Sequence, residues 1–264
     1  MSQFYGKLFE NHRRIEENPH LEKVIELSDR LLKLLFPERC SKEYMMQREL
    51  ELDFEELQIE FIHLVSKVKP FLKDSCEQIV EKFFSKIPDI YEEIKKDATA
   101  IANNDPAAND ELEVIKTYPG FYAIAVYRLA HELHLLNVPY IPRVLTEGVH
   151  SKTGIDIHPG ATIGSSFCID HGTGIVIGET CKIGENVKVY QNVTLGALSV
   201  DKNMSDTKRH PTLGNNVIVY SGATILGGES VIGDNTIIGG NVWLTHGVPA
   251  NVKVYNRSEV VIKE

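Results

Sequence analysis

Apolar residues in the first half of the chain recur at steps of three and four positions. This spacing is typical of amphipathic helices that turn one face toward a core. We expect helices over 21–35, 44–68, 71–84, 89–102, 121–136 and 143–150. Asp105 and Pro106 suit the start of a further helix, and Tyr118-Pro119-Gly120 marks a break. The pattern predicts a helical domain over 1–150 that also makes subunit contacts.

Near residue 151 the helical spacing stops, and aliphatic residues return every six positions in four successive registers. They are Ile157, Ile163, Ile169 and Ile175, then Ile177, Ile183, Val189 and Leu195, then Leu213, Val219 and Ile225, then Ile232, Ile238 and Leu244. A fixed short period predicts a parallel β-helix in which repeats stack and share one core. We expect about five coils over 151–246. No helical pattern separates the strands, which excludes a doubly wound fold.

The six-residue pattern is interrupted once. Residues 198–209 are polar and lack the repeat, so we expect a loop extruded from the β-helix. Loops on a rigid scaffold often carry binding residues. We expect residues 247–264 to form a C-terminal tail. The fold class is therefore α+β.

Charge is distributed unevenly over the 264 residues, whose net charge is −9. Residues 1–150 hold most of the acidic surplus, which supports two domains and argues against a nucleic-acid surface. No apolar run is long enough to cross a bilayer, and no signal peptide is visible, so we expect a cytoplasmic protein. We expect Cys168 and Cys181 to be small core residues rather than nucleophiles.

Histidines beside charged residues supply the candidate chemistry of the repeat region. Asp156 lies two positions before His158, Asp170 precedes His171, and Arg209 precedes His210. Asp156 and Asp170 are separated by less than one coil, so they belong to different faces or corners. We expect any site built from them to lie at a subunit interface.

Three interpretations of these histidines stay open on spacing alone. An imidazole beside a carboxylate can act as a general base. Several histidines can bind a metal, but none here lies three to five residues from another in the repeat, so we expect no metal site. The third interpretation is structural, and we prefer it for His158 and His246.

Five segments of the repeat region together resemble the serine acetyltransferase family. They are residues 154–161 (GIDIHPGA), 170–174 (DHGTG), 178–180 (GET), 190–196 (YQNVTLG) and 208–211 (KRHP). Asp105-Pro106-Ala107 and the segment 127–131 resemble the helical domain of the same family. The resemblance covers residues from about 89 to 246.

The resemblance implies a left-handed β-helix and transfer of acetyl from acetyl-CoA to the hydroxyl of L-serine, a step of cysteine biosynthesis. His171 matches the general base, and Asp156 matches its partner carboxylate. Asp105 and Asp170 match the groups that hold the amino end of serine, and Arg209 and His210 match those that hold its carboxylate. The region that binds CoA between subunits is matched by Gly196, Ala197, Ser221 and Gly222.

The resemblance also implies partners. Family members form homotrimers, often doubled to hexamers, and many are inhibited by L-cysteine. The chain ends in Glu264 instead of isoleucine, so we do not expect a stable complex with O-acetylserine sulfhydrylase. Two other functions stay open: an acetyltransferase for a sugar or another acceptor, and a β-helix scaffold without catalytic activity.

Overall fold

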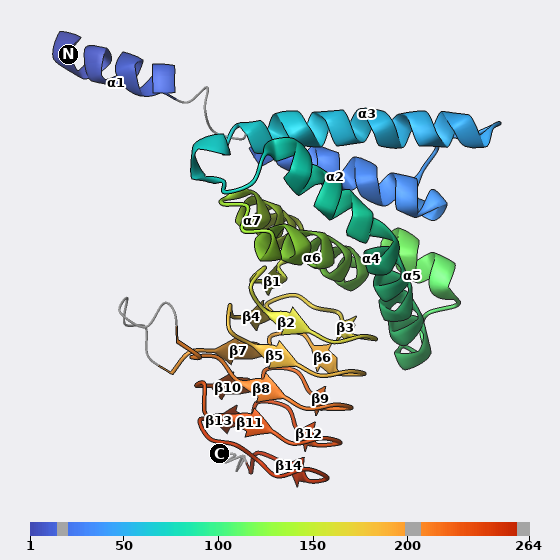
Figure 1. Cartoon of the computed structure of the whole chain (residues 1–264). Helices are drawn as coiled ribbons and strands as arrows, with labels where there is room; N and C mark the ends of the chain where they lie inside the picture. The colour runs from blue at the N-terminus through green and yellow to red at the C-terminus, as the bar shows by residue number, and fades with distance from the viewer. Residues whose placement is uncertain (15–20, 199–206, 258–264) are drawn as a thin grey trace, which may run out of the picture.

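A computed structural model describes residues 1–14, 21–198 and 207–257 of the chain (Figure 1). Helices form the N-terminal part, and a parallel β-solenoid of about five turns follows. The helices are α1 (Ser2–Arg14), α2 (Leu21–Leu35), η2 (Pro37–Arg39), α3 (Gln47–Ser66), η3 (Lys69–Phe71), α4 (Cys76–Asn104), α5 (Glu111–Thr117), α6 (Pro119–Leu135) and α7 (Ile141–Thr153). Within the described residues, none of these helices combines the length and apolar character that a bilayer crossing requires.

Three differences from the predicted helices have physical reasons. The two helices expected over 71–84 and 89–102 form one helix, α4, which continues through Pro88 because its apolar residues pack along one continuous core face. Asp105 ends α4 instead of starting a helix, and Asp110 caps the next one by accepting a bond from the Glu113 N–H. Helix α1 was not predicted; it lies apart from the other helices in Figure 1.

The solenoid has three faces of parallel strands. Face A contains β1 (Asp156–Ile157), β4 (Val176–Ile177), β7 (Thr194–Gly196), β10 (Thr224–Leu226) and β13 (Trp243–Leu244). Face B contains β2 (Thr162–Ile163), β5 (Lys182–Ile183), β8 (Thr212–Leu213) and β11 (Val231–Ile232). Face C contains β3 (Cys168–Asp170), β6 (Lys188–Tyr190), β9 (Ile218–Val219), β12 (Ile237–Ile238) and β14 (Lys253–Val254).

Aliphatic residues of the predicted registers line the three faces inside each coil, and those of successive coils stack into the columns of the solenoid core. On face A, Ile157, Ile177, Leu195, Ile225 and Leu244 stack in register, and all are buried. Burying an aliphatic side chain contributes roughly 1.5–3 kcal/mol, so stacked repeats stabilise one another. The parallel β-solenoid predicted from the six-residue period is confirmed. Helix α7 continues to Thr153, and β14 pairs with β12 inside the segment expected to be the tail.

A buried ion pair joins the helices to the first coil. Arg128 on α6 binds the Asp97 carboxylate on α4, and its Nη2 also donates to the Gly164 carbonyl at 2.9 Å. The other contact of Asp97 is the Phe167 N–H, 2.8 Å from its Oδ1. Burial raises the pKa of Asp97, while Arg128 opposes that change. This network holds α4 against the start of the solenoid, where the candidate site residues lie.

Candidate active site

His171 projects from the corner where face C turns into face A, which we call the C–A corner (residues 171–174 in the first coil). Its backbone has φ +59°, a left-handed conformation that histidine adopts more readily than bulky residues, and Gly172 continues the turn at φ +87°. The His171 side chain is 73% exposed, and its Nε2 lies 3.8 Å from Asp170 Oδ1. The turn therefore presents the imidazole to whatever lies outside this corner.

Asp170 is held from its other side by Lys188. The Lys188 ammonium lies 3.2 Å from Asp170 Oδ2 and donates to the Asn104 carbonyl at 2.7 Å. Burial lowers the pKa of Lys188, but its contacts with Tyr190 and Asp170 outweigh burial, so the pKa is raised. On face C, Lys188 aligns with Cys168 on one neighbouring strand and with Ile218 on the other. A charged residue at a position that is apolar in the neighbouring repeats is the sequence feature that could have identified Lys188.

Asp105 belongs to the same cluster because α4 ends beside face C. Its carboxylate accepts bonds from the Tyr118 hydroxyl at 2.7 Å and from the Ala107 N–H at 2.8 Å. The Tyr118 bond, followed by the Ala107 bond, lowers the pKa of Asp105, and the charges of Lys188 and His171 act in the same direction. The structure therefore brings together three predicted residues: Asp105, Asp170 and His171. Sequence reasoning missed Lys188 and Tyr118.

Arg209 and His210 lie at a different corner, where face A turns into face B, which we call the A–B corner. Residues 178–181 form this corner in the coil of β4 and β5, and residues 207–211 lead into β8 on the next coil. Thr180 Oγ1 accepts the backbone N–H groups of Arg209 and His210 at 3.0 Å each. The Arg209 guanidinium forms an ion pair with Glu179. Thr180 and Glu179 therefore position both predicted residues, and sequence reasoning assigned neither a role.

His210 is neutral and presents a defined nitrogen. Its Nδ1 accepts the Thr180 N–H at 3.1 Å, so the ring proton lies on Nε2. Burial, together with the charges of Arg209 and Lys208, lowers the pKa of His210 to about 4. A Cβ on residue 178 would overlap the His210 ring, so Gly178 is needed for this packing. The A–B corner thus offers an arginine beside a neutral N–H donor.

His158 and His134 complete the A–B corner near Glu179. Gly160 N–H donates to His158 Nδ1 at 3.0 Å, and burial lowers the pKa of His158 to about 4. Burial also lowers the pKa of His134. Burial disfavours the charged form of Glu179, but Arg209 and His158 outweigh that effect and lower its pKa. A cavity of about 740 Å³ opens beside this group, lined by His134, Glu179, Thr180 and Lys208 among others.

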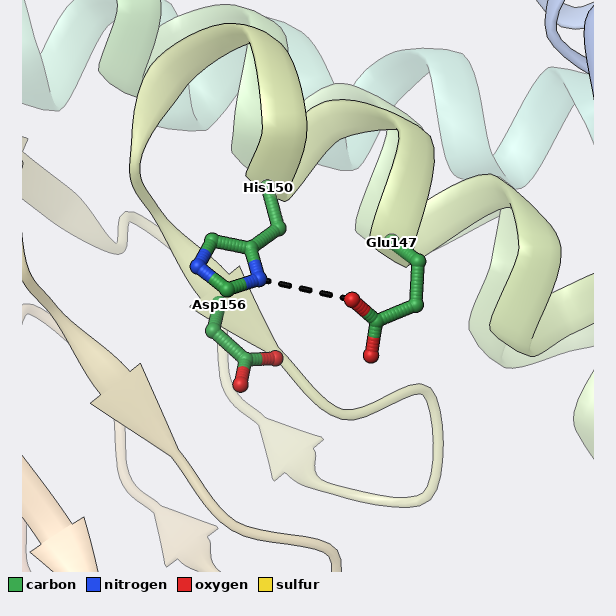
Figure 2. A group of neighbouring side chains, drawn as sticks. All are labelled: Glu147, His150 and Asp156. Carbon is green, nitrogen blue, oxygen red and sulfur yellow. Dashed lines mark hydrogen bonds and ion pairs between the residues drawn. The ribbon is translucent and has the colours of Figure 1, made fainter.

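Asp156 begins the face A strand β1, where its backbone N–H donates to the Ile175 carbonyl at 2.9 Å, and its side chain contacts helix α7 (Figure 2). Asp156 Oδ1 is 3.9 Å from Arg143 Nη1. The side chains of Glu147, His150 and Asp156 also lie together, with one oxygen or nitrogen atom of each within 4.8 Å of those of the other two. Arg143 also forms an ion pair with Glu147. Because the Arg143 guanidinium contacts both carboxylates, we interpret the group as an ion-pair network around Asp156.

The residues predicted to bind CoA divide between the same two corners. Gly196 and Ala197 end the face A strand β7 at the A–B corner, whereas Ser221 and Gly222 precede β10 at the C–A corner. Residues 199–206 of the expected extruded loop, and residues 258–264 of the expected tail with Glu264, lie outside the described residues. One chain therefore places its predicted site residues at both edges of face A: five at the C–A corner, four at the A–B corner, and Asp156 at the start of strand β1.

Comparison with known proteins relates both parts of the chain to one family. The family model "Serine acetyltransferase, N-terminal" matches residues 38–126. A "Serine acetyltransferase, plasmid" of Synechococcus elongatus is 46% identical over 184 residues, which span 68% of this chain and 57% of that protein. A Bacillus subtilis serine acetyltransferase is 43% identical over 175 residues, which span 63% of this chain and 79% of that protein.

A solved structure shows the same fold. Entamoeba histolytica serine acetyltransferase 1, in a crystal structure with L-cysteine, matches with a TM-score of 0.80 and 38% identity over 88% of this chain and 86% of that chain.

The helical domain, the hexapeptide solenoid and the histidine-bearing corners define an acyltransferase of the hexapeptide-repeat class. Since it is 43% identical to the Bacillus subtilis protein and spans 79% of that protein, the chain belongs to the serine acetyltransferase family.

Proposed function

We propose that this protein is a serine O-acetyltransferase, which transfers acetyl from acetyl-CoA to the hydroxyl of L-serine and releases O-acetyl-L-serine and CoA. The observation that carries the proposal is the complementary chemistry of the two corners. One presents an exposed imidazole among carboxylates, and the other presents an arginine beside a neutral N–H donor. Serine is a zwitterion with a hydroxyl, and these are the partners that its three polar groups require.

The C–A corner suits the ammonium group of serine. Asp105 and Asp170 supply two carboxylates, and Lys188 balances one of them. One negative charge is left without a cationic partner within the cluster, and an ammonium group would compensate it. Asp105 is half-buried, and its carboxylate can pair with an ammonium group that enters from solvent.

The A–B corner suits the carboxylate of serine. Arginine offers a rigid fork of donors that matches a carboxylate, and the Nε2–H of His210 adds a third donor. Because His210 stays neutral well below pH 7, it remains a directional donor at physiological pH.

Catalysis follows from the exposed imidazole. His171 takes the proton from the serine hydroxyl while the oxygen attacks the thioester carbonyl, and the thiolate of CoA leaves. Asp156 orients the imidazole and stabilises its protonated form. No acyl-enzyme is needed: burial raises the pKa of Cys168 and of Cys181 to about 12, so neither thiol is suited to be a nucleophile.

The site requires a second copy of the chain. The C–A and A–B corners are separated by the width of face A, on the order of 15 Å for the four or five extended residues from the end of one corner to the start of the next. One serine molecule cannot reach both corners of the same coil. A cyclic trimer that packs the C–A corner of one protomer against the A–B corner of the next would join them, and would also bring Asp156 of one copy to His171 of another.

The proposed interface between protomers also accounts for the other ligands. CoA would contact backbone groups on both sides of this interface, at Gly196 and Ala197 of one corner and at Ser221 and Gly222 of the other. L-cysteine has the charged groups of serine, so we expect it to compete with serine and to inhibit the enzyme. A cytoplasmic role in cysteine biosynthesis follows from the reaction.

The direct test measures thiol release from acetyl-CoA with and without L-serine. We expect serine-dependent release by the wild type and a loss of about 10²–10⁴-fold in kcat in His171→Ala, the usual contribution of a general base. His246→Ala removes an exposed solenoid histidine and should leave the rate unchanged. Serine-independent release, or equal rates for His171→Ala and His246→Ala, would refute the proposal.

A further inference from the structure

A cavity of about 590 Å³ in the helical part carries an excess of positive charge. It lies where α2, η2, α5, α6 and α7 meet, and none of its lining residues belongs to the candidate active site. Its charged lining consists of four cations and two carboxylates: Lys33, Arg39, Lys116 and Lys152 against Asp29 and Glu38. The lining therefore holds a surplus of two positive charges, in a volume suited to a small ligand.

Two of the cations have no partner to balance them. The ammonium groups of Lys33 and Lys116 form no hydrogen bond or ion pair with any residue in the ranges that the structure describes. Lys152 is different, because its ammonium lies 3.2 Å from Asp29 Oδ2 and 3.2 Å from the Tyr122 hydroxyl. The two unpaired ammonium groups account for the surplus charge.

Arg39 is held so that it contributes donors to the cavity. Its Nη1 donates to the Ile115 carbonyl at 2.6 Å, and its guanidinium lies 5.3 Å from the centre of the Tyr122 ring. A guanidinium has five N–H donors, and this bond uses one of them. The stacking and the single bond set the plane of a cation that keeps further donors for a ligand.

Glu38 adds an acceptor that the protein leaves unsatisfied. Its Oε2 is buried and has no hydrogen-bond partner among the described residues. A buried acceptor without a donor is costly and therefore uncommon in folded proteins. The cavity thus pairs a strongly cationic lining with one acceptor that awaits an O–H or N–H donor.

We propose that this cavity binds a small phosphate ester that carries a hydroxyl group. The phosphate dianion balances the surplus charge through Lys33, Lys116 and Arg39, and the hydroxyl donates to Glu38 Oε2. The site is distinct from the acetyl-transfer site and does not depend on the proposed function. Lys152 on α7 connects it to β1, because the chain passes from α7 into the strand that carries Asp156.

The experiment is calorimetric titration of the full-length protein with glycerol 3-phosphate and with inorganic phosphate, at ionic strength matched with sodium chloride. We expect saturable binding of both probes, with glycerol 3-phosphate the tighter because of its hydroxyls. Lys33→Ala and Lys116→Ala should each weaken binding about tenfold, the effect of one charge-assisted hydrogen bond. Glu38→Ala should narrow the difference in affinity between glycerol 3-phosphate and inorganic phosphate, because it removes the acceptor for the hydroxyl of the ester.

Lys73→Ala is the matched control, because Lys73 is an exposed lysine of the same part of the chain and lies outside the cavity. It should bind both probes like the wild type. Thermal melts without ligand show whether the exposed-lysine variants keep the fold. Binding that is unaffected by Lys33→Ala and Lys116→Ala, or equally weakened by Lys73→Ala, would overturn the proposal, as would the absence of saturable binding in the wild type.

Discussion

The two corners that edge face A present their histidines in opposite ways. At the C–A corner a left-handed turn presents His171 to the outside, with its ring 73% exposed. At the A–B corner His210 is buried, neutral and bound by Thr180. The imidazole that we expect to act in catalysis is open to solvent at the C–A corner. At the A–B corner, Thr180 already holds the expected binding residues in position within a single chain. The difference fits the proposed function, in which His171 acts on a serine whose carboxylate is held at the A–B corner.

The largest effect should come from breaking the ion pair under the open corner. Lys188→Met leaves Asp170 without its cation, and we expect a loss of about 3 kcal/mol in the free energy of unfolding, measured by urea denaturation. Lys86→Met is the control, because the Lys86–Asp89 pair is exposed and should contribute little. Similar small losses in both variants would contradict the role given to Lys188.

The next effect tests the preassembled corner. Thr180→Val removes the acceptor for the N–H groups of Arg209 and His210, and we expect a loss of about 2 kcal/mol in stability and a higher KM for serine. The exposed Thr245→Val, outside the cavity at the A–B corner, is the control and should change neither value. A Thr180 variant with normal stability and KM would show that the positions of Arg209 and His210 do not depend on this hydroxyl.

Arg209→Lys should separate binding from chemistry. Lysine keeps the charge but loses the planar fork, so we expect KM for serine to rise about tenfold while kcat changes less. Steady-state kinetics with saturating acetyl-CoA measures both. A fall in kcat with an unchanged KM would move Arg209 from serine binding to the chemical step.

The smallest effect for a single residue is the pH dependence that two histidines of the A–B corner give to stability. Burial lowers the folded-state pKa of His158 and His210 to about 4, below the usual 6.5, so the unfolded chain binds more protons between these values. Stability should therefore fall as the pH falls from 6.5 toward 4, by on the order of 1–2 kcal/mol per histidine after allowance for partial exposure. Urea denaturation of the wild type and His158→Gln measures the slope, which should be shallower in the variant. An equal slope would mean that His158 does not contribute.

The solenoid could be predicted from the sequence because its core residues repeat at a fixed spacing. Aliphatic residues such as Ile177 and Leu195 must occupy equivalent positions in each coil, so their spacing was enough to predict the solenoid and its core. The sequence did not predict that α4 continues through Pro88 or that Asp105 ends it, because packing against the rest of the domain outweighs local signals there. The left hand of the coil rests on the family resemblance.

The site was less predictable for a related reason. His171 and Arg209 stand in segments that resemble the family, but their supports act across long stretches of chain. Lys188 reaches a carbonyl 84 residues away, and Thr180 binds backbone 29 and 30 residues away. Only the folded chain brings such pairs together, so no local pattern identified them.

The central claim is that each active site joins the C–A corner of one protomer to the A–B corner of another. Its most direct test is complementation between His171→Ala and Arg209→Ala chains, each nearly inactive alone. Co-expressed in equal amounts as trimers, they should regain roughly one quarter of wild-type serine-dependent CoA release, because random assembly leaves that share of interfaces with both residues intact. Activity no higher than that of the two single variants would contradict the account, since it would place both residues in a site within one chain.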